Sequence, residues 1–526
     1  MSAKIERAII SVSDKEGVAR FVRGLVEAGV EIFSTGGTRR HLEDAGISVQ
    51  DIAAYTGFPE MMEGRLKTLH PKVHGGILCR HNRDDDMTSL KEHNILSFPL
   101  VVVNLYPFEQ TVARPDVTDE QAIENIDIGG PTMIRAAAKN HEFTTVVTEP
   151  SQYDEVLQQV RASGSTTLVL RRRLAAAAFK RTASYDRAIT EYFARAADSG
   201  GPPTAALPAQ LNLNLVRHAE LRYGENPHQQ AALYRLPDAA MCNLVTARQL
   251  NGKQLSYNNL LDLDSALALV RMLPEAGAVV MKHNNPCGAA AAESLVEATR
   301  KAFEGDPVSA FGSVLGFNQV VDVATAELLA EPGKFVEAIV APGYDGGAVE
   351  VLTTKPKWKS NVRLIDAGDF GGAAAAIQFR NIEGGMLVQQ SDCDPADYSC
   401  WSVVTDAQPT DQQVADLRFA WTLVRQVKSN AITLCKEQAL CGAGAGQMSR
   451  VDSVEISINK AGDRAAGCVL ASDAFFPFPD SIETAAAAGV TAVVQPGGSK
   501  GDDGVIAACN AQGLPMIFTG RRHFKH

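Results

Sequence analysis

Short runs of β-branched and other apolar residues alternate with amphipathic segments over the first 46 residues of the chain. The order is RAIISVS (7–13), KEGVARFVRGLVEAG (15–29), VEIFSTGG (30–37) and TRRHLEDAG (38–46). Strands that are connected through helices form a parallel sheet, and such sheets bind ligands at the carboxyl ends of their strands. The pattern therefore predicts an α/β fold whose functional residues lie in the loops after the strands.

Later segments indicate how the chain divides into domains. LVVVNLY (100–106) is typical of a strand buried on both faces, and IGGPTMIRAAAKNH (128–141) has the Gly and Pro of a helix start. DSGGPPTAALPAQ (198–210) lacks apolar periodicity, and we interpret it as a linker between domains 1–199 and 200–526. The second domain is too long for a typical single core, so we expect two subdomains within it.

Two segments of the second domain resemble each other. GAVVMKHNNPCG (277–288) and SNAITLCKEQALCGAGAG (429–446) both lead from an apolar strand into a polar loop that contains Gly. A duplicated α/β unit and a chance likeness are both consistent with these segments.

Composition excludes several classes of protein. The 526 residues include 61 acidic and 50 basic ones, a net charge of −11, so the chain offers no global basic face to a nucleic-acid backbone. Its longest apolar run, LAAAAF (174–179), is far shorter than the roughly 20 residues of a membrane span. Nine cysteines without framework spacing and a start without a signal-peptide pattern favour the cytoplasm. We expect a cytoplasmic protein with small-molecule substrates and no nucleic-acid or membrane partner.

Two loops of the first domain are candidates for binding a phosphate. SVSDK (11–15) and STGGT (34–38) each follow a strand and open a helix, where backbone N–H groups can close on an anion. Helix capping by Ser13 and Asp14 is an equally good explanation of the first loop.

A third loop, GRLKTLHPKVHGG (64–76), concentrates basic side chains in an acidic chain. Arg and Lys supply charge-assisted hydrogen bonds to phosphate, so this loop favours a phosphorylated ligand. His70 and His74 have the spacing of a zinc helix, but Pro71 lies between them and the metalloprotease Glu is absent.

Three further polar residues of the first domain lie at the ends of predicted elements. Tyr106 and Asp127 end predicted strands or loops, and Lys139 follows an Ala run at a predicted helix end. Each has an ordinary structural explanation, a packed ring for Tyr106 and a solvated helix end for Lys139. Together they indicate acid–base chemistry.

KHNNPCG (282–288) ends a predicted strand with Lys282 and His283 side by side. It differs from the zinc deaminase signature, because Asn285 replaces the Glu and Ala290 replaces the second Cys, so we expect no metal. A Lys–His pair suits removal of a proton from a weak amine nucleophile, although a surface histidine is the simpler alternative.

Other motifs are weaker. GAGAGQ (442–447) does not fit the dinucleotide fingerprint, and no GK is followed by Ser or Thr as a P-loop requires. GGSKG (497–501) does fit GxSxG, with His523 and His526 downstream, which keeps a serine hydrolase as an alternative. The clusters RYGENPHQ (222–229) and TGRRHFKH (519–526) suit a planar phosphorylated heterocycle or simply a solvated surface.

The whole chain resembles the family of bifunctional purine-biosynthesis proteins that join AICAR formyltransferase to IMP cyclohydrolase. The segments that carry the resemblance, in chain order, are SVSDK, STGGT, TGFPEMMEGRLKTLHPKVHGG, VNLYPF, ENIDIGGPTMIRAAAKNH, LRYGENPHQ, VMKHNNPCG, GAGAGQMSR, SDAFFPFPDSIE, VVQPGGS and RHFKH.

The resemblance implies a fold, a reaction and an assembly. It implies a methylglyoxal-synthase-like cyclohydrolase domain followed by a formyltransferase part of two cytidine-deaminase-like α/β subdomains without zinc. The formyl group of 10-formyltetrahydrofolate would pass to the amine of AICAR, and the product would close to IMP with loss of water. Relatives are homodimers, and no metal is needed.

It also implies roles for single residues. In the formyltransferase, His283 would be the base, Lys282 would support it and Asn430 would hold the reacting carbonyl or carboxamide. AICAR would bind to Arg222, Tyr223, Arg522 and His526. The folate would face Phe311, Val451, Phe475, Phe478 and Asp480.

In the cyclohydrolase, the resemblance assigns proton transfer to Tyr106, Asp127 and Lys139, and counts Lys67 with the catalytic residues. The nucleotide would bind to Ser11, Lys15, Thr35, Gly36, Gly37, Thr38, Arg65 and Thr68. Two other classes stay open at this point: a serine hydrolase that depends on Ser499, and a nucleotide-binding module without turnover.

Overall fold

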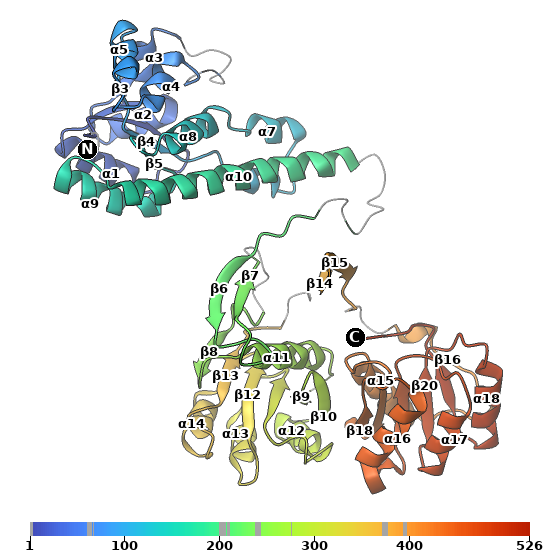
Figure 1. Ribbon diagram of the computed structural model, residues 1–526. Coiled ribbons are helices and arrows are strands. Elements are labelled where there is room, and N and C mark those ends of the chain that lie inside the picture. The colour runs from blue at the N-terminus through green and yellow to red at the C-terminus, as the bar shows by residue number, and fades with distance from the viewer. Residues whose placement is uncertain are drawn as a thin grey trace. The chain divides into compact units, whose positions relative to one another are not determined.

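The computed structural model describes residues 4–59, 66, 68–198, 207, 211–236, 243–274, 276–370, 377–392 and 397–526. The chain divides into two compact units, residues 1–205 and 206–526 (Figure 1). Apart from Asp198 and Leu207, the predicted linker lies outside the described residues. The boundary at 199/200 therefore stays a prediction.

The first unit contains a five-stranded sheet in the order β3-β2-β1-β4-β5, and every neighbouring pair is parallel. Its strands are β1 (Arg7–Ser11), β2 (Glu31–Ser34), β3 (Gln50–Asp51), β4 (Leu100–Val103) and β5 (Thr145–Val147). The chain passes from β1 to β2 on one side and returns to β4 on the other. Open parallel sheets bind ligands at such a switch point, outside the carboxyl ends of the strands.

Helices connect these strands, and apolar spacing explains where they form. Helix α1 buries Val18, Phe21, Val22 and Leu25, which is the one-sided spacing of an amphipathic helix. All four residues of β4 are buried, which confirms the strand predicted there. The helices are α1 (Val18–Glu27), α2 (Gly36–Asp44), α3 (Ile52–Thr56), α4 (Pro71–Leu78), α5 (Asp84–Glu92), α6 (Phe108–Val112), α7 (Asp119–Glu124), α8 (Gly129–Lys139), α9 (Tyr153–Ser163) and α10 (Leu168–Asp198).

The second unit is built on a twelve-stranded sheet in the order β16-β21-β20-β19-β17-β18-β10-β9-β11-β12-β13-β8. Two separate hairpins accompany it, β6 (Val216–Leu221) with β7 (Ala231–Arg235) and β14 (Ile377–Ile382) with β15 (Gly385–Gln390). Two edge strands complete the sheet, β8 (Arg248–Asn251) and β16 (Ser402–Val403).

The rest of the sheet consists of two copies of one α/β unit, so the duplication is confirmed. The first copy is α11 (Tyr257–Val270), β9 (Ala276–Lys282), β10 (Asn285–Ala292), α12 (Leu295–Glu304), β11 (Ser313–Phe317), α13 (Val323–Ala330), β12 (Val336–Ala341), α14 (Gly346–Thr354) and β13 (Arg363–Asp366). The second is α15 (Asp411–Val424), β17 (Ile432–Lys436), β18 (Ala439–Gly444), α16 (Arg450–Ala461), β19 (Val469–Ser472), α17 (Asp480–Ala487), β20 (Ala492–Gln495), α18 (Asp502–Ala511) and β21 (Met516–Phe518).

The two copies meet at β10 and β18, which pair antiparallel. The strand order of the second copy, read outward from this junction, repeats that of the first, so an approximate twofold relation connects them. Both copies need a glycine where their second strand passes the following helix. A Cβ on Gly288 would lie 1.8 Å from the Ala302 carbonyl oxygen, and one on Gly442 would lie 2.1 Å from that of Ser457.

We expect Gly288→Ala to destabilise the second unit, because the added methyl group collides with backbone that cannot move aside. The free energy of unfolding should fall by about 1–3 kcal/mol or more. Gly346→Ala is the matched control, since a Cβ there meets nothing within 4 Å. Thermal unfolding followed by circular dichroism measures both, and equal midpoints would contradict the expectation.

Candidate active sites

The loop after β1 is tied to the start of α2 by Lys15 and Thr38. The Lys15 ammonium donates to the Val12 carbonyl oxygen and, over 2.8 Å, to the Thr38 hydroxyl. Thr38 is buried, accepts from the Val12 N–H (3.1 Å) and donates to the Val12 carbonyl oxygen (2.9 Å). Burial lowers the pKa of Lys15, and Asp14 partly opposes this. A half-buried ammonium whose hydrogen-bond partners are neutral oxygens suits an anionic ligand.

Asn104, which the sequence analysis did not select, connects β4 to the same loop. Its Oδ1 accepts from the backbone N–H groups of Ser13 (2.5 Å) and Asp14 (3.0 Å), and its Nδ2 donates to the Asp14 carbonyl oxygen (3.1 Å). Its place directly after a buried strand was the available signal. Gly17 occupies the N-cap of α1, so the capping explanation of Ser13 and Asp14 is wrong.

The start of α2 is open to a ligand. Helix α2 begins at Gly36, directly after the carboxyl end of β2, and the Thr35 side chain makes no capping hydrogen bond there. A Cβ on Gly37 would meet nothing within 4 Å. The first N–H groups of this helix have no intrahelical partner and carry partial positive charge. Ser11 and Lys15 lie at the same carboxyl end of the sheet as these N–H groups.

Asp127 caps the start of α8 in the same unit. Its carboxylate accepts from the Gly130 N–H (2.8 Å), and its own N–H donates to the Tyr185 hydroxyl (2.8 Å) on α10. Burial raises the pKa of Asp127, opposed by the backbone hydrogen bonds from Gly130 and Tyr106. Asp127 and Tyr106 are thus neighbours, and the Tyr106 side chain is 46% exposed.

Thr68 joins this group, whereas Lys139 does not. A Cβ on Gly129 would lie 2.8 Å from the Thr68 hydroxyl, which places Thr68 against the first turn of α8. Lys139 is exposed and ends the same helix, about 15 Å from Gly129 at 1.5 Å per residue. The predicted Arg65 and Lys67 lie outside the described residues.

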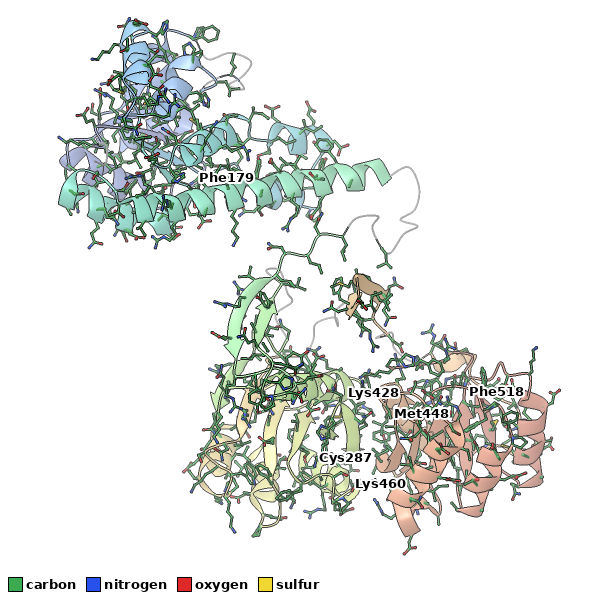
Figure 2. The ribbon with its side chains drawn as sticks, viewed as in Figure 1. Phe179, Cys287, Lys428, Met448, Lys460 and Phe518 are labelled. Atoms are coloured by element: carbon green, nitrogen blue, oxygen red, sulfur yellow. The ribbon has the colours of Figure 1, made fainter. Side chains whose placement is uncertain are left out.

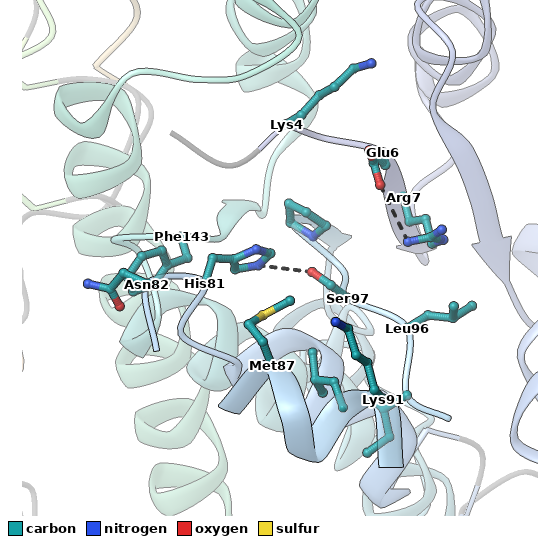
Figure 3. Close-up of a pocket in the computed structure, with 13 residues that line it drawn as sticks. Lys4, Glu6, Arg7, His81, Asn82, Met87, Lys91, Leu96, Ser97 and Phe143 are labelled. Atoms are coloured by element: carbon teal, nitrogen blue, oxygen red, sulfur yellow. Dashed lines mark hydrogen bonds and ion pairs between the residues drawn. The ribbon is translucent and has the colours of Figure 1, made fainter. Parts of the chain in front are cut away.

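A pocket of about 800 Å³ lies in the first unit, and none of the predicted site residues lines it. Figure 3 shows His81, Met87 and Lys91 around it, with the His81 ring 3.0 Å from the Ser97 hydroxyl. Arg7 begins β1 and Pro99 precedes β4, so the pocket lies at the amino ends of the strands. It is separate from the candidate site at their carboxyl ends.

In the second unit, strand direction brings the predicted residues to one edge of the large sheet. Strands β9, β18, β19 and β21 run the same way, and β11 and β17 run the opposite way. The residues that follow β9, β18, β19 and β21 therefore lie at the same end of the strands as the residues that precede β11 and β17. They include the predicted Lys282, His283, Phe311, Asn430, Val451, Phe475, Phe478, Asp480, Arg522 and His526.

Lys282 and His283 lie at the tip of the β9–β10 hairpin. The Lys282 ammonium donates to the carbonyl oxygens of Ser309 (3.2 Å) and Phe311 (3.0 Å), so it fixes the segment that carries the predicted folate contact. His283 is exposed. The second repeat reaches this hairpin through the Lys428 N–H, which donates to Asn285 Oδ1 (3.1 Å), and Lys428 lies between the two halves of the sheet in Figure 2.

Asn430 is held in a buried polar network. Its Oδ1 accepts from Arg450 (2.6 Å), and its Nδ2 donates to the carbonyl oxygens of Gln447 (2.9 Å) and Met448 (3.2 Å). Arg450 forms an ion pair with the fully buried Asp473 (2.6 Å). The Asn430 amide keeps one lone pair of Oδ1 for a ligand. Sequence reasoning gave Arg450 and Asp473 no role.

The predicted folate contacts expose apolar surface at this edge. Phe311 is 58%, Phe475 38% and Phe478 65% exposed, and Asp480 begins α17 beside them in sequence. Val451, in the first turn of α16, is half-buried. Exposed aromatic rings that border a polar centre suit a flat heterocyclic ligand.

The predicted AICAR contacts come from two chain segments. The Arg222 guanidinium lies 5.5 Å from the Tyr223 ring centre, and Arg522 lies 4.3 Å from the Phe524 ring. The first segment is connected to α11, because Asn258 Nδ2 donates to the Glu225 carbonyl oxygen (3.2 Å). His526, at the end of the second segment, has its ring centre 5.8 Å from that of Phe524.

The geometry does not support the hydrolase alternative. The Ser499 hydroxyl accepts from the Gly501 N–H (3.0 Å) at the start of α18. His523 is buried, and its Nδ1 lies 2.5 Å from the Asp392 carboxylate. Burial opposes ionisation of Asp392, but its contacts with His523 and Arg425 lower the pKa of that carboxyl. The serine and the histidine therefore have separate partners.

In the described part of the chain, no helix is long and apolar enough to cross a membrane. Among the same residues, no three His, Cys, Asp or Glu side chains gather as a metal site requires.

The chain is similar to known proteins over almost its whole length. The family model described as AICARFT/IMPCHase bienzyme matches residues 137–460, and the MGS-like domain model matches residues 17–132. The bifunctional purine biosynthesis protein PurH of Rhodopirellula baltica is 56% identical over 522 residues, 99% of each chain. PurH of Bacillus cereus strain B4264 is 47% identical over 521 residues, which are 99% of this chain and 100% of the relative. A crystal structure of ForH matches 37% of this chain and 99% of its own, with 34% identity and a TM-score of 0.34.

These matches confirm the expected fold class, an MGS-like domain followed by an AICARFT/IMPCHase part. Both units of the structure are α/β. The chain belongs to the AICARFT/IMPCHase bienzyme family, the bifunctional PurH enzymes of late purine biosynthesis.

Proposed function

We propose that the two activities of this bienzyme lie in separate units, with IMP cyclohydrolase in residues 1–199 and AICAR formyltransferase in residues 200–526. One observation carries the proposal: two sheets each gather one set of polar groups at one edge. The first unit gathers Lys15, Thr38 and two helix starts, and the second gathers the Lys282–His283 hairpin and Asn430.

In the formyltransferase, the amine of AICAR attacks the formyl carbon of 10-formyltetrahydrofolate. A carbon–nitrogen bond forms to the amine and the bond to N10 of the folate breaks. His283 takes the proton that the amine loses, and N10 gains a proton as tetrahydrofolate leaves. Lys282 and Asn430 orient the reacting groups. Arg222, Tyr223, Arg522 and His526 bind the nucleotide. The exposed rings of Phe311, Phe475 and Phe478, with Val451 and Asp480, receive the folate.

In the cyclohydrolase, the carboxamide nitrogen of formyl-AICAR attacks the formyl carbon of the same molecule, and water leaves. Ser11, Lys15, Thr35, Gly36, Gly37 and Thr38 bind the phosphate, together with Arg65 and Thr68. Asp127 and Tyr106, which are neighbours, transfer protons, and Lys67 and Lys139 complete the assigned set. Orientation supplies much of the rate, because ring closure is intramolecular.

We also propose the location, assembly and partners of the enzyme. The enzyme is a cytoplasmic homodimer that acts on AICAR, formyl-AICAR and folate, with no metal, nucleic-acid or membrane partner. Sedimentation of the purified chain tests the dimer, and activity in the presence of a chelator tests the independence from metal.

The central experiment combines the purified chain with AICAR and 10-formyltetrahydrofolate. We expect tetrahydrofolate, followed by absorbance, and IMP, followed by chromatography, to rise together. Tetrahydrofolate with accumulating formyl-AICAR would show that the cyclohydrolase assignment is wrong. If neither tetrahydrofolate nor IMP forms, both assignments are wrong.

We expect His283→Ala to lower formyl transfer by about 10²–10⁴-fold, because it removes the general base. Cyclisation of supplied formyl-AICAR should be unchanged. Lys139→Ala should do the reverse. Cyclisation at the normal rate in that variant would remove Lys139 from the assigned set.

We expect binding of IMP to the first unit to weaken as pH rises in the alkaline range below 10.5. Burial lowers the pKa of Lys15, so its ammonium is lost before that of an ordinary lysine, and a phosphate favours the charged form. Calorimetry between neutral and alkaline pH measures the affinity. Lys15→Met should bind weakly at every pH, and an unchanged pH dependence in that variant would contradict this role.

A further inference from the structure

The hairpin that presents His283 has an unfavourable backbone conformation. Lys282 pairs with Asn285, so His283 and Asn284 form a two-residue connection. Both have positive φ, +54° and +61°. Such turns favour Asn-Gly, because a residue with a Cβ is strained in this region of backbone conformation. A group outside the turn must therefore stabilise it.

Asp262, on the neighbouring helix α11, supplies that group. Its Oδ1 accepts from the Asn284 N–H over 2.7 Å. With the Asn284 amide oriented so that both of its ends are satisfied, its nitrogen lies 2.9 Å from the Leu261 carbonyl oxygen and 3.3 Å from Asp262 Oδ1. The carboxylate is thus bonded to the turn itself and not to the imidazole. A hydrogen bond to a charged acceptor contributes more than a neutral one.

The second repeat contains the same arrangement of a helix aspartate and a positive-φ turn, but its turn has no histidine. Glu437 and Gln438 connect β17 to β18 with φ of +51° and +53°. Asp416 on α15 accepts from both of their N–H groups, at 3.1 and 2.8 Å. The spacing is the same, since 416 − 262 and 437 − 283 both equal 154. The aspartate and the strained turn belong to the duplicated fold, but only the first copy presents an imidazole.

We propose that Asp262 is a positioning residue for formyl transfer. It holds the His283–Asn284 turn so that the imidazole faces the candidate site to which both repeats contribute. The inference rests on the proposed role of His283. In this role Asp262 does not contact the reacting atoms. It acts by fixing the backbone from which His283 projects, as Asp416 fixes the corresponding turn at the opposite edge of the sheet.

The test compares Asp262→Ala, Asp262→Asn, Asp262→Glu and the matched control Asp416→Ala. In Asp262→Ala we expect kcat for formyl transfer to fall by about 10²-fold, with KM for AICAR changed much less, because a misplaced catalytic group costs rate more than binding. Asp262→Asn keeps the acceptor oxygen, so its kcat should stay within about threefold of the unmodified enzyme. Asp262→Glu keeps the charge but displaces the oxygen, so its kcat should fall as in Asp262→Ala.

Two readouts separate positioning from loss of fold. Cyclisation of supplied formyl-AICAR should be unchanged in every variant, and Asp416→Ala should melt at a lower temperature while its kcat for formyl transfer is kept. Normal kcat in Asp262→Ala, activity in Asp262→Glu but not in Asp262→Asn, or an equal loss in Asp416→Ala would overturn the inference. If His283→Ala itself kept formyl transfer, the proposed function of that site would fail, independently of these results.

Discussion

The antiparallel pairing of β10 with β18 determines which loops of the second unit lie side by side. Ala290 pairs with Ala439, and the Ala291 N–H donates to the Gln438 carbonyl oxygen (3.0 Å). Because the two repeats are joined in opposite directions, the carboxyl end of β9 and the amino end of β17 meet at one edge. The hairpin with His283 thereby reaches the segment with Asn430. The candidate site residues of the second unit therefore come from both copies.

The two units differ in how a buried positive charge is paired. In one unit the partner is a carboxylate, and in the other the partners are neutral oxygens. In the second unit, Arg450 is neutralised by the fully buried Asp473, and breaking such a pair leaves an uncompensated buried charge. That pair fixes Asn430 in place. In the first unit, the Lys15 ammonium bonds to the neutral oxygens of Val12 and Thr38, and an incoming phosphate would complete its neutralisation. The ion pair in the second unit fixes a neighbouring side chain, whereas the Lys15 ammonium in the first unit keeps its charge for the proposed phosphate.

Local patterns predicted the elements well where one physical signal dominates. A continuous apolar run predicted β4, and alternation of strand and helix predicted the parallel sheet. The likeness of 277–288 to 429–446 indicated the duplication that the structure contains. Local reasoning failed for the contacts of Asn104 and Asp262, which connect groups 90 and 22 residues apart. No periodicity encodes such distant contacts. Capping by Ser13 and Asp14 was plausible locally, but Gly17 takes that position because the loop is held by Asn104.

The sequence by itself determined the α/β class and the family, because strand and helix periods and short motifs are local properties of the chain. Only the tertiary structure decided which residues share an edge. It placed Thr68 and Asp127 at the start of α8 and Lys139 at its exposed end. It also joined the β9–β10 hairpin to the segment before β17, through Asn285 and Lys428. The reason is that strand direction and sheet order arise from pairing between distant segments, which no local pattern specifies.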